Sequence, residues 1–213
     1  MIDTILFDLD GTLLNTLEDL CDSANYALEQ FGYPPRSLSE VRGFVGEGVR
    51  LLIERALPDG AKEKTDEALA VFSPHYHRNK EKKPRPYDGV REMLNDVCPR
   101  YKTAIVSNKY DAAVLDLRAK LFPQVALAVG ERAGLRKKPA PDMAEFALAA
   151  LHSTKRTAVY VGDSDVDIAT ARNSGLPIIA VSWGFRDRAL LERLGADVII
   201  DHPRELAAAL EKL

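Results

Sequence analysis

Two acidic residues stand two positions apart in the apolar segment "ILFDLDGTLLNT", residues 5–16. Residues i and i+2 of an extended chain point to the same side, so Asp8 and Asp10 would face one site at the end of a strand. Buried carboxylates are costly unless a partner compensates their charge. Gly11 permits a tight turn after them, and the amides beyond it can face an anion. An Asp-Gly turn with solvated acids explains the same residues equally well.

A second acidic cluster lies in "YVGDSDVDIATARNSG", residues 160–175. Asp163 follows an apolar run and is placed to cap a helix, with Asp165 and Asp167 in the first turn, where acids suit the helix dipole. Capping alone would explain these positions. However, Asp163 and Asp167 are four residues apart, where like charges on one helix face repel each other. A divalent cation would turn that repulsion into attraction, and oxygen ligands without His or Cys favour Mg²⁺ over zinc.

Two further polar segments, "IVSNKY" and "RKKPAPD", follow other apolar runs. Ser107 and Asn108 end a predicted strand and offer neutral hydrogen-bond donors. Lys138 precedes Pro139, which favours an extended rather than a helical backbone. Each segment has a plain alternative, a loop for Ser-Asn and a solvated basic pair for the lysines. Their order along the chain, after the first acidic pair and before the second, favours one shared anion site.

The elements that must position these residues alternate between strand and helix. This alternation predicts an α/β fold with a doubly wound parallel sheet and helices on both faces. Ligands of such sheets bind at the carboxyl ends of the strands, where the polar segments lie. The predicted strands span residues 4–9, 103–107, 125–129, 157–161, 177–181 and, more weakly, 197–200, and the predicted helices span residues 88–98, 141–151, 163–174 and 205–213.

One region interrupts the alternation. Apolar spacing between residues 16 and 83 predicts helices over 17–31, 39–42, 48–57 and 61–78, the last with a possible break at Pro74, and no convincing strand. The exit "KEKKPRPYDG" is charged and holds two prolines, as a linker or hinge does. We therefore expect two domains: residues 1–15 with 84–213 as the core, and residues 16–83 as a helical insertion.

The bulk composition limits the class of protein. The chain has 213 residues, 46% hydrophobic and 29% charged, which indicates a well-filled core. A net charge of −3 gives no general attraction to nucleic acid or to an acidic membrane. No segment reaches the roughly 18 apolar residues of a membrane span, and no secretory signal is recognisable. Cys21 and Cys98 are expected as free thiols in a reducing cytoplasm, the location that these absences favour.

The four polar motifs together resemble those of the haloacid dehalogenase superfamily. "DLDGT", Ser at the end of the next core strand, Lys before Pro, and "GDSDVD" occur in the family's order on the expected elements. The resemblance implies a Rossmann-like core with a helical cap of the C1 type. Within the superfamily, "RGFVGEGVRLLIERAL", "HYHRNKEKKPRPYDGVREML" and "KKPAPD" resemble phosphoglycolate phosphatases. Dehalogenases lack the second aspartate of the first motif, so Asp10 points to phosphoryl transfer.

The resemblance also implies roles for the motif residues. Asp8 would be the nucleophile that forms an aspartyl-phosphate, and Asp10 the general acid and then the general base. Mg²⁺ would be held by Asp8, Asp163 and the backbone carbonyl of Asp10, with Asp167 orienting a water on the metal or the Lys138 ammonium. The phosphoryl oxygens would be bound by Ser107 and Lys138, assisted by Asn108 and by the amides of Gly11 and Thr12.

The cap would close over this site about hinges near residues 14–16 and 83–87. For Gly46 and Gly48 a loop before a helix is slightly favoured over substrate contact, and Arg42 and Arg50 are expected on the solvated surface. Packing or surface positions are expected for His75, Tyr76, His77 and Trp183.

The expected activity is Mg²⁺-dependent hydrolysis of a small phosphorylated metabolite, with 2-phosphoglycolate as the first candidate. Three alternatives remain open: a mutase of the β-phosphoglucomutase type, a pyrophosphatase or nucleotide phosphatase, and a non-catalytic phosphate-binding protein. The last would be expected to lose motif aspartates or Lys138, and none is lost. No nucleic-acid or membrane partner is expected, and both monomer and homodimer remain open.

Overall fold

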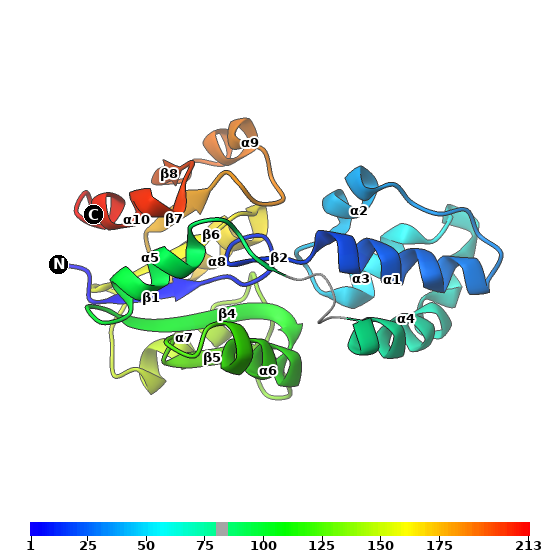
Figure 1. The fold of residues 1–213 in the computed structure, drawn as a ribbon, viewed down its shortest axis with the longest axis horizontal. Helices are drawn as coiled ribbons and strands as arrows, with labels where there is room; N and C mark the ends of the chain where they lie inside the picture. The colour runs from blue at the N-terminus through cyan, green and yellow to red at the C-terminus, as the bar shows by residue number, and fades with distance from the viewer. Residues whose placement is uncertain (80–84) are drawn as a thin grey trace. The chain divides into compact units, whose positions relative to one another are not determined.

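The computed structural model describes residues 1–79 and 85–213. They form two compact units, residues 1–14 with 86–213 and residues 15–85 (Figure 1). The expected boundary between residues 83 and 84, and the first two residues of the expected exit hinge, lie outside the described residues. The chain leaves the first unit in β2 (Leu14–Asn15) and returns in β3 (Arg85–Pro86), and these two short strands pair with each other.

The larger unit is built on a six-stranded sheet in the order β5-β4-β1-β6-β7-β8, and every pair is parallel. All six predicted strands are present, so the doubly wound α/β prediction is confirmed. The first ends at Phe7, two residues earlier than predicted, and the second extends past Ser107 to Tyr110 with an irregular register after Val106. The strands are β1 (Thr4–Phe7), β4 (Lys102–Tyr110), β5 (Leu127–Glu131), β6 (Ala158–Gly162), β7 (Ile178–Val181) and β8 (Val198–Ile200).

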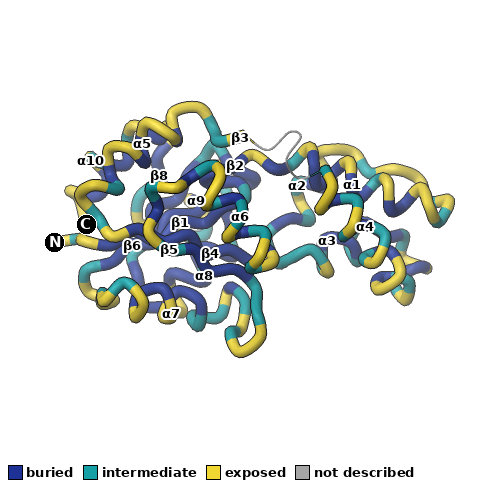
Figure 2. Tube along the Cα trace, turned by 60° about the horizontal axis from the view of Figure 1, so that its bottom comes forward, coloured by how far each residue is buried: buried dark blue, intermediate teal, exposed yellow. Residues whose placement is uncertain are grey.

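Both faces of this sheet are covered, which explains why its strands are continuous apolar runs. Ile5 and Phe7 of β1 belong to one core cluster and Leu6 to the other, as the alternation of side chains along a strand requires. Figure 2 shows the buried residues gathered in the central strands and the exposed ones along the surrounding helices. Packing on both faces therefore fixes the strands that the motif residues follow.

Helices of the larger unit cover these two faces. The first cluster packs α5 (Val90–Val97), α6 (Asp111–Leu121) and α10 (Leu206–Leu210) onto the sheet, and the second packs α7 (Asp142–Ala150), α8 (Asp165–Ser174) and α9 (Arg188–Arg193). Two of these helices, α6 and α9, were not predicted. Only Val114 and Leu117 of α6 are buried and α9 has six residues, so neither carries a clear apolar period. The last predicted helix, residues 205–213, is shorter in the structure, because α10 ends at Leu210 and follows the 3₁₀ turn η2 (Pro203–Glu205).

The smaller unit is helical, as predicted. It contains α1 (Leu17–Gln30), α2 (Leu38–Phe44), α3 (Val49–Ala56), the 3₁₀ segment η1 (Asp59–Lys64) and α4 (Thr65–Asn79). The possible break at Pro74 is wrong, because α4 continues through this residue. Proline removes one backbone donor, and burial of Phe72 and Tyr76 on either side of it fixes the helix in place.

Two expectations from composition concern the whole chain. Cys21 and Cys98 are free thiols, as expected. Across residues 1–79 and 85–213, no helix has both the length and the apolar content needed to cross a membrane.

Candidate active site

The sequence motifs meet at the carboxyl ends of four adjacent strands. Asp8 directly follows β1, Ser107 and Asn108 lie in the irregular part of β4, and Asp163 directly follows β6. Lys138 comes from the loop between β5 and α7. Because these strands are parallel neighbours, their carboxyl ends lie at one edge of the sheet and bring together residues up to 155 positions apart.

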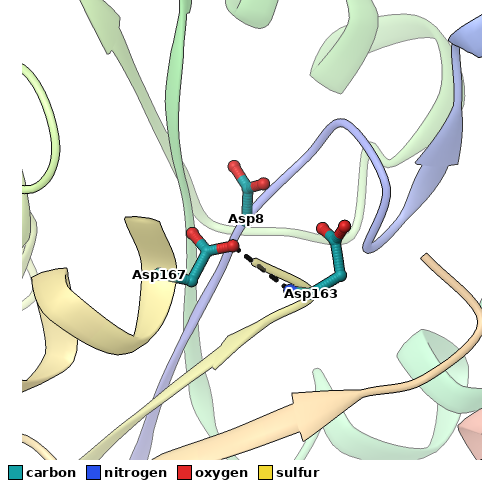
Figure 3. Close-up of side chains that lie close together, drawn as sticks. All are labelled: Asp8, Asp163 and Asp167. Carbon is teal, nitrogen blue, oxygen red and sulfur yellow. Dashed lines mark hydrogen bonds between the residues drawn. The ribbon is translucent and has the colours of Figure 1, made fainter. Parts of the chain in front are cut away.

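Three carboxylates form a buried cluster at this edge. Asp8, Asp163 and Asp167 each offer an oxygen within 4.8 Å of the others, and the exposed fractions of the three residues are 7%, 0% and 0%. Figure 3 shows them converging from the end of β1, the end of β6 and the first turn of α8. Such a group of oxygens, without histidine or cysteine, suits a hard divalent cation.

Asp163 is held by contacts from two distant loops. One carboxylate oxygen accepts a hydrogen bond from the Thr12 hydroxyl at 2.9 Å and the other from the Phe185 amide at 2.8 Å. A Cβ added at Gly11 would lie 2.4 Å from this carboxylate, and one added at Gly184 would lie 2.3 Å from the Asp163 Cβ. Gly11 also adopts φ +96°, which favours glycine. The two glycines therefore leave the space that Asp163 occupies.

Ser164, and not Asp163, caps helix α8. The Ser164 hydroxyl accepts from the Asp167 amide, and one Asp167 oxygen accepts from the Ser164 amide and hydroxyl and from the Asp163 amide. The predicted helix face shared by Asp163 and Asp167 is wrong, because Asp163 precedes the helix. The two side chains nevertheless lie close, because the capping turn brings them together (Figure 3).

Lys138 lies between two members of the acidic cluster. Its ammonium is 2.7 Å from Asp8 Oδ1, 2.7 Å from Asp167 Oδ1 and 3.1 Å from the Tyr160 hydroxyl, and Lys138 is only 3% exposed. The Asn108 side chain accepts from the Lys138 amide at 2.7 Å and donates to its carbonyl at 2.9 Å. Asn108 therefore positions the lysine loop, whereas the sequence favoured a contact with phosphate.

Asp10 has a cationic partner that the sequence analysis missed. The Lys109 ammonium lies 3.0 Å from both Asp10 carboxylate oxygens, and the two side chains are 5% and 14% exposed. Lys109 directly follows the Ser-Asn motif, and that adjacency was the available signal. Asp10 and Asp8 are thus paired with different lysines, although they stand two residues apart.

Other contacts refine the predicted phosphate ligands. The Gly11 amide donates to the Leu14 carbonyl at 2.9 Å, so it closes the turn after Asp10. The Ser107 hydroxyl accepts from the Lys109 amide at 3.3 Å and retains its own proton for donation. The indole N–H of Trp183, expected only as a packing or surface residue, donates to the Thr12 carbonyl at 3.0 Å.

Burial and charge shift the ionisation of the cluster. Burial raises the pKa of Asp8 well above its ordinary value, against the opposing effect of Lys138. Burial would lower the pKa of Lys138, but Asp167 and Asp8 outweigh it and hold that pKa well above its ordinary value. Burial and the charge of Asp167 raise the pKa of Asp163 to about 7. Lys138 alone therefore does not compensate the three carboxylates.

The donor set fits a magnesium ion. One ammonium against three carboxylates leaves two negative charges, which one divalent cation would balance. Asp167 has one oxygen on the Lys138 ammonium and the other on three donors of the capping turn. Each Asp163 oxygen instead accepts from a single neutral donor, and Asp8 meets Lys138 through Oδ1, so Asp8 and Asp163 are the better direct ligands. These features agree with the chemistry of hard-cation sites.

Four of the residues singled out in the sequence, Gly46, Gly48, Arg50 and His75, lie in the smaller unit. Gly48 caps α3 with φ 93°, and Gly46 has φ 130°. Arg50 forms an exposed ion pair with Asp66. His75 is stacked on Tyr26, which agrees with the packing alternative of its two expected positions.

Comparison with known proteins places the chain in a family. The model of the haloacid dehalogenase-like hydrolases matches residues 5–181. The chain belongs to the haloacid dehalogenase-like hydrolase family. It is 36% identical to a phosphoglycolate phosphatase of Mesorhizobium japonicum, over 88% of this chain and 86% of that protein. It is also 36% identical to a phosphoglycolate phosphatase of Caulobacter vibrioides, over 92% of this chain and 86% of that one.

Solved structures of haloacid dehalogenase-like proteins share the fold along the whole chain. A crystal structure from Lactobacillus delbrueckii, of a protein assigned as a phosphoglycolate phosphatase, superposes with a TM-score of 0.94 at 35% identity and covers 98% of both chains. The expected haloacid dehalogenase fold and hydrolase class are confirmed by these matches.

Proposed function

We propose that this protein is a Mg²⁺-dependent phosphatase that hydrolyses 2-phosphoglycolate to glycolate and phosphate. The observation that carries the proposal is the convergence of Asp8, Asp163 and Lys138 in one buried cluster, with Asp10 two residues beyond Asp8. Relatives at 36% identity that are named phosphoglycolate phosphatases support the choice of substrate.

In the proposed first step a carboxylate oxygen of Asp8 attacks phosphorus, and the bond from phosphorus to the substrate's ester oxygen breaks. Asp10 gives a proton to the departing alkoxide. Lys138, 2.7 Å from Asp8, orients the nucleophile, and its positive charge attracts the phosphoryl oxygens. The Ser107 hydroxyl is a second donor for these oxygens.

In the second step Asp10 takes a proton from water, whose oxygen attacks the phosphorus of the aspartyl-phosphate. The bond between phosphorus and Asp8 breaks, phosphate leaves and the Asp8 carboxylate is restored. The same residue thus serves as acid and then as base, because the first step leaves it deprotonated. Lys138 remains beside Asp8 and stabilises the charge that spreads over the phosphoryl oxygens in both steps.

Asp8 and Asp163 would hold the magnesium ion, with the backbone carbonyl of Asp10 as a third ligand. Bound there, the ion would supply positive charge for the phosphoryl oxygens. Asp167 would act through Lys138, because Asp167 Oδ1 is 2.7 Å from that ammonium. Asn108 would hold the lysine loop, and Thr12 would hold Asp163.

The test is release of phosphate from 2-phosphoglycolate and from a panel of other phosphate esters at fixed Mg²⁺. Wild type is expected to hydrolyse 2-phosphoglycolate with the highest kcat/KM. Asp8→Asn changes charge with little change of volume, so it should fold normally and lose at least about 10⁴-fold in activity. Asp3→Asn, at the exposed residue directly before β1, is the matched control and should keep full activity.

Two results would contradict the proposal. Undiminished turnover by Asp8→Asn would remove the covalent mechanism. A low rank of 2-phosphoglycolate in the panel would remove the substrate, while the phosphatase chemistry would stand.

A further inference from the structure

One buried hydroxyl beside the candidate site has no part in the proposed chemistry. Tyr160 lies in the middle of β6, a strand covered on both faces, and among the described residues it is the largest side chain that is completely buried. Strands of this kind are normally apolar throughout, and a phenylalanine would fill nearly the same space. Burying a hydroxyl is costly unless it is hydrogen-bonded, so the partners of this one indicate its use.

Both partners of the Tyr160 hydroxyl belong to segments that hold the proposed phosphoryl ligands. The hydroxyl donates to the Val106 carbonyl at 3.1 Å and accepts from the Lys138 ammonium at 3.1 Å. Val106 directly precedes Ser107, at the point where the register of β4 becomes irregular. Because β1 lies between β6 and β4 in the sheet, the tyrosine side chain reaches across the central strand. One hydroxyl thus links Lys138 to the strand that carries Ser107.

The hydrogen bonds of this hydroxyl have fixed directions. A phenol has one proton, and because that proton is donated to Val106, the oxygen faces Lys138 with a lone pair. Burial raises the pKa of Tyr160 well above its ordinary value, so the hydroxyl keeps its proton at neutral pH. The Lys138 ammonium has three protons and three acceptors, of which two are carboxylates and the third is this hydroxyl.

We propose that Tyr160 is a positioning residue that holds Lys138 as a fixed positive charge beside the phosphoryl group. The inference rests on the proposed function, in which that charge stabilises the transition states of both steps. Two carboxylates alone would leave the ammonium free to turn about the line that joins them. A third acceptor from another strand removes this freedom, and because it is neutral it does not offset the positive charge. Charges that need no rearrangement during the reaction stabilise a transition state best.

The first test compares the kinetics of Tyr160→Phe and wild type with Mg²⁺. The variant keeps the ring and loses only the hydroxyl, so it should fold. We expect kcat to fall about 5- to 10-fold, roughly the effect of one neutral hydrogen bond, while KM stays within about twofold of wild type. The loss should be equal for 2-phosphoglycolate and for p-nitrophenyl phosphate, because both esters present the same phosphoryl group to Lys138.

A second measurement shows whether the effect passes through Lys138. In isotope-labelled protein, the nuclear magnetic resonance signal of the Lys138 ammonium, identified by its loss in Lys138→Met, reports proton exchange with water. An ammonium held by three acceptors exchanges slowly, so Tyr160→Phe should speed this exchange about 5- to 10-fold. Tyr101→Phe is the matched control. It removes a hydroxyl directly before the amino end of β4, away from the site, and should leave both kcat and the exchange at wild-type values.

The outcomes separate this inference from the proposed function. An unchanged kcat in Tyr160→Phe would overturn the positioning role, and so would a loss confined to KM. A lower kcat without faster exchange at Lys138 would also overturn it, because the hydroxyl would then act by another route. Hydrolysis of p-nitrophenyl phosphate but not of 2-phosphoglycolate by wild type would remove the proposed substrate and leave the inference to be judged on the first ester. Hydrolysis of neither ester would overturn the proposed function and this inference with it.

Discussion

The ammonium of Lys138 and the carboxylate of Asp8 lie 2.7 Å apart, although 130 residues separate them in the chain. The pair is buried, and Asp167 shares the same ammonium. Lys138 therefore links its own loop, which precedes α7, to the carboxyl end of β1 and to the first turn of α8. Its loss should affect the fold as well as the chemistry.

Lys138→Met should destabilise the protein by about 3–5 kcal/mol, because Asp8 and Asp167 would be left buried without their cation. Urea unfolding without metal at neutral pH measures the change. Removing the second charge in Lys138→Met/Asp167→Asn should recover part of the loss, while phosphatase activity remains absent. Lys137→Met, at the adjacent half-buried lysine, should stay within about 0.5 kcal/mol of wild type. Equal stability of Lys138→Met and wild type would show that the pair has no structural role.

Gly184→Ala should weaken the binding of magnesium. The added Cβ would lie 2.3 Å from the Asp163 Cβ and 2.5 Å from its Cγ, so the carboxylate must move. We expect the Mg²⁺ concentration for half-maximal activity to rise about 10- to 100-fold, the usual effect of disturbing the support of a ligand. Gly43→Ala is the control, since an added Cβ meets no atom within 4 Å there. An unchanged Mg²⁺ requirement in Gly184→Ala would show that Asp163 is not a ligand.

Trp183→Phe should cost about 1 kcal/mol of stability, because the Thr12 carbonyl loses the indole donor while an aromatic ring remains. Thermal unfolding of the variant checks this value. Trp183 is also the one tryptophan in the sequence, and its partner Thr12 contacts Asp163. Titration of wild type with Mg²⁺ should therefore change the tryptophan emission, with a half-point that agrees with activity. A flat titration would place the ion away from the Thr12 loop.

The stability of the metal-free protein should fall as pH rises through about 7, in part because of Asp163. Its folded-state pKa, about 7, lies above the roughly 3.9 of an unfolded chain, so the folded state binds the proton more tightly. Its contribution is thus complete below the unfolded value and is lost as pH rises through the folded value. Magnesium requires the ionised carboxylate, so the stabilisation by Mg²⁺ should grow over the same range.

Thermal midpoints from pH 5 to 8.5, in EDTA and in excess Mg²⁺, test this linkage. In Asp163→Asn the amide can still accept from Phe185 and donate to the Thr12 hydroxyl, so the variant should fold. Its midpoint should depend less on pH than that of wild type and respond little to Mg²⁺. An equal Mg²⁺ increment for wild type at pH 6 and pH 8 would contradict the assignment.

The local sequence pattern predicted most of the strands and helices, and it predicted most of the residues that lie at the candidate site. Apolar runs at residues 4–9 and 157–161 predicted central parallel strands, because strands covered on both faces have no polar side. Parallel strands share one carboxyl edge, so Asp8, Asp163 and Lys138 were expected together before any coordinates. Helices with few buried residues, such as α6 and α9, escaped prediction because a 3.6-residue period needs a wide apolar face to be visible.

Only the tertiary structure decided which partner each charged group has. Spacing put Asp163 and Asp167 on one helix face, but Ser164 caps the helix and the two aspartates meet across its first turn. Asp10 pairs with Lys109 over 99 residues, and Trp183 reaches Thr12 over 171. The physical reason is that periodicity and capping are set by near neighbours in sequence, whereas hydrogen bonds and charge pairs depend on which remote segments the folded sheet brings within about 3 Å.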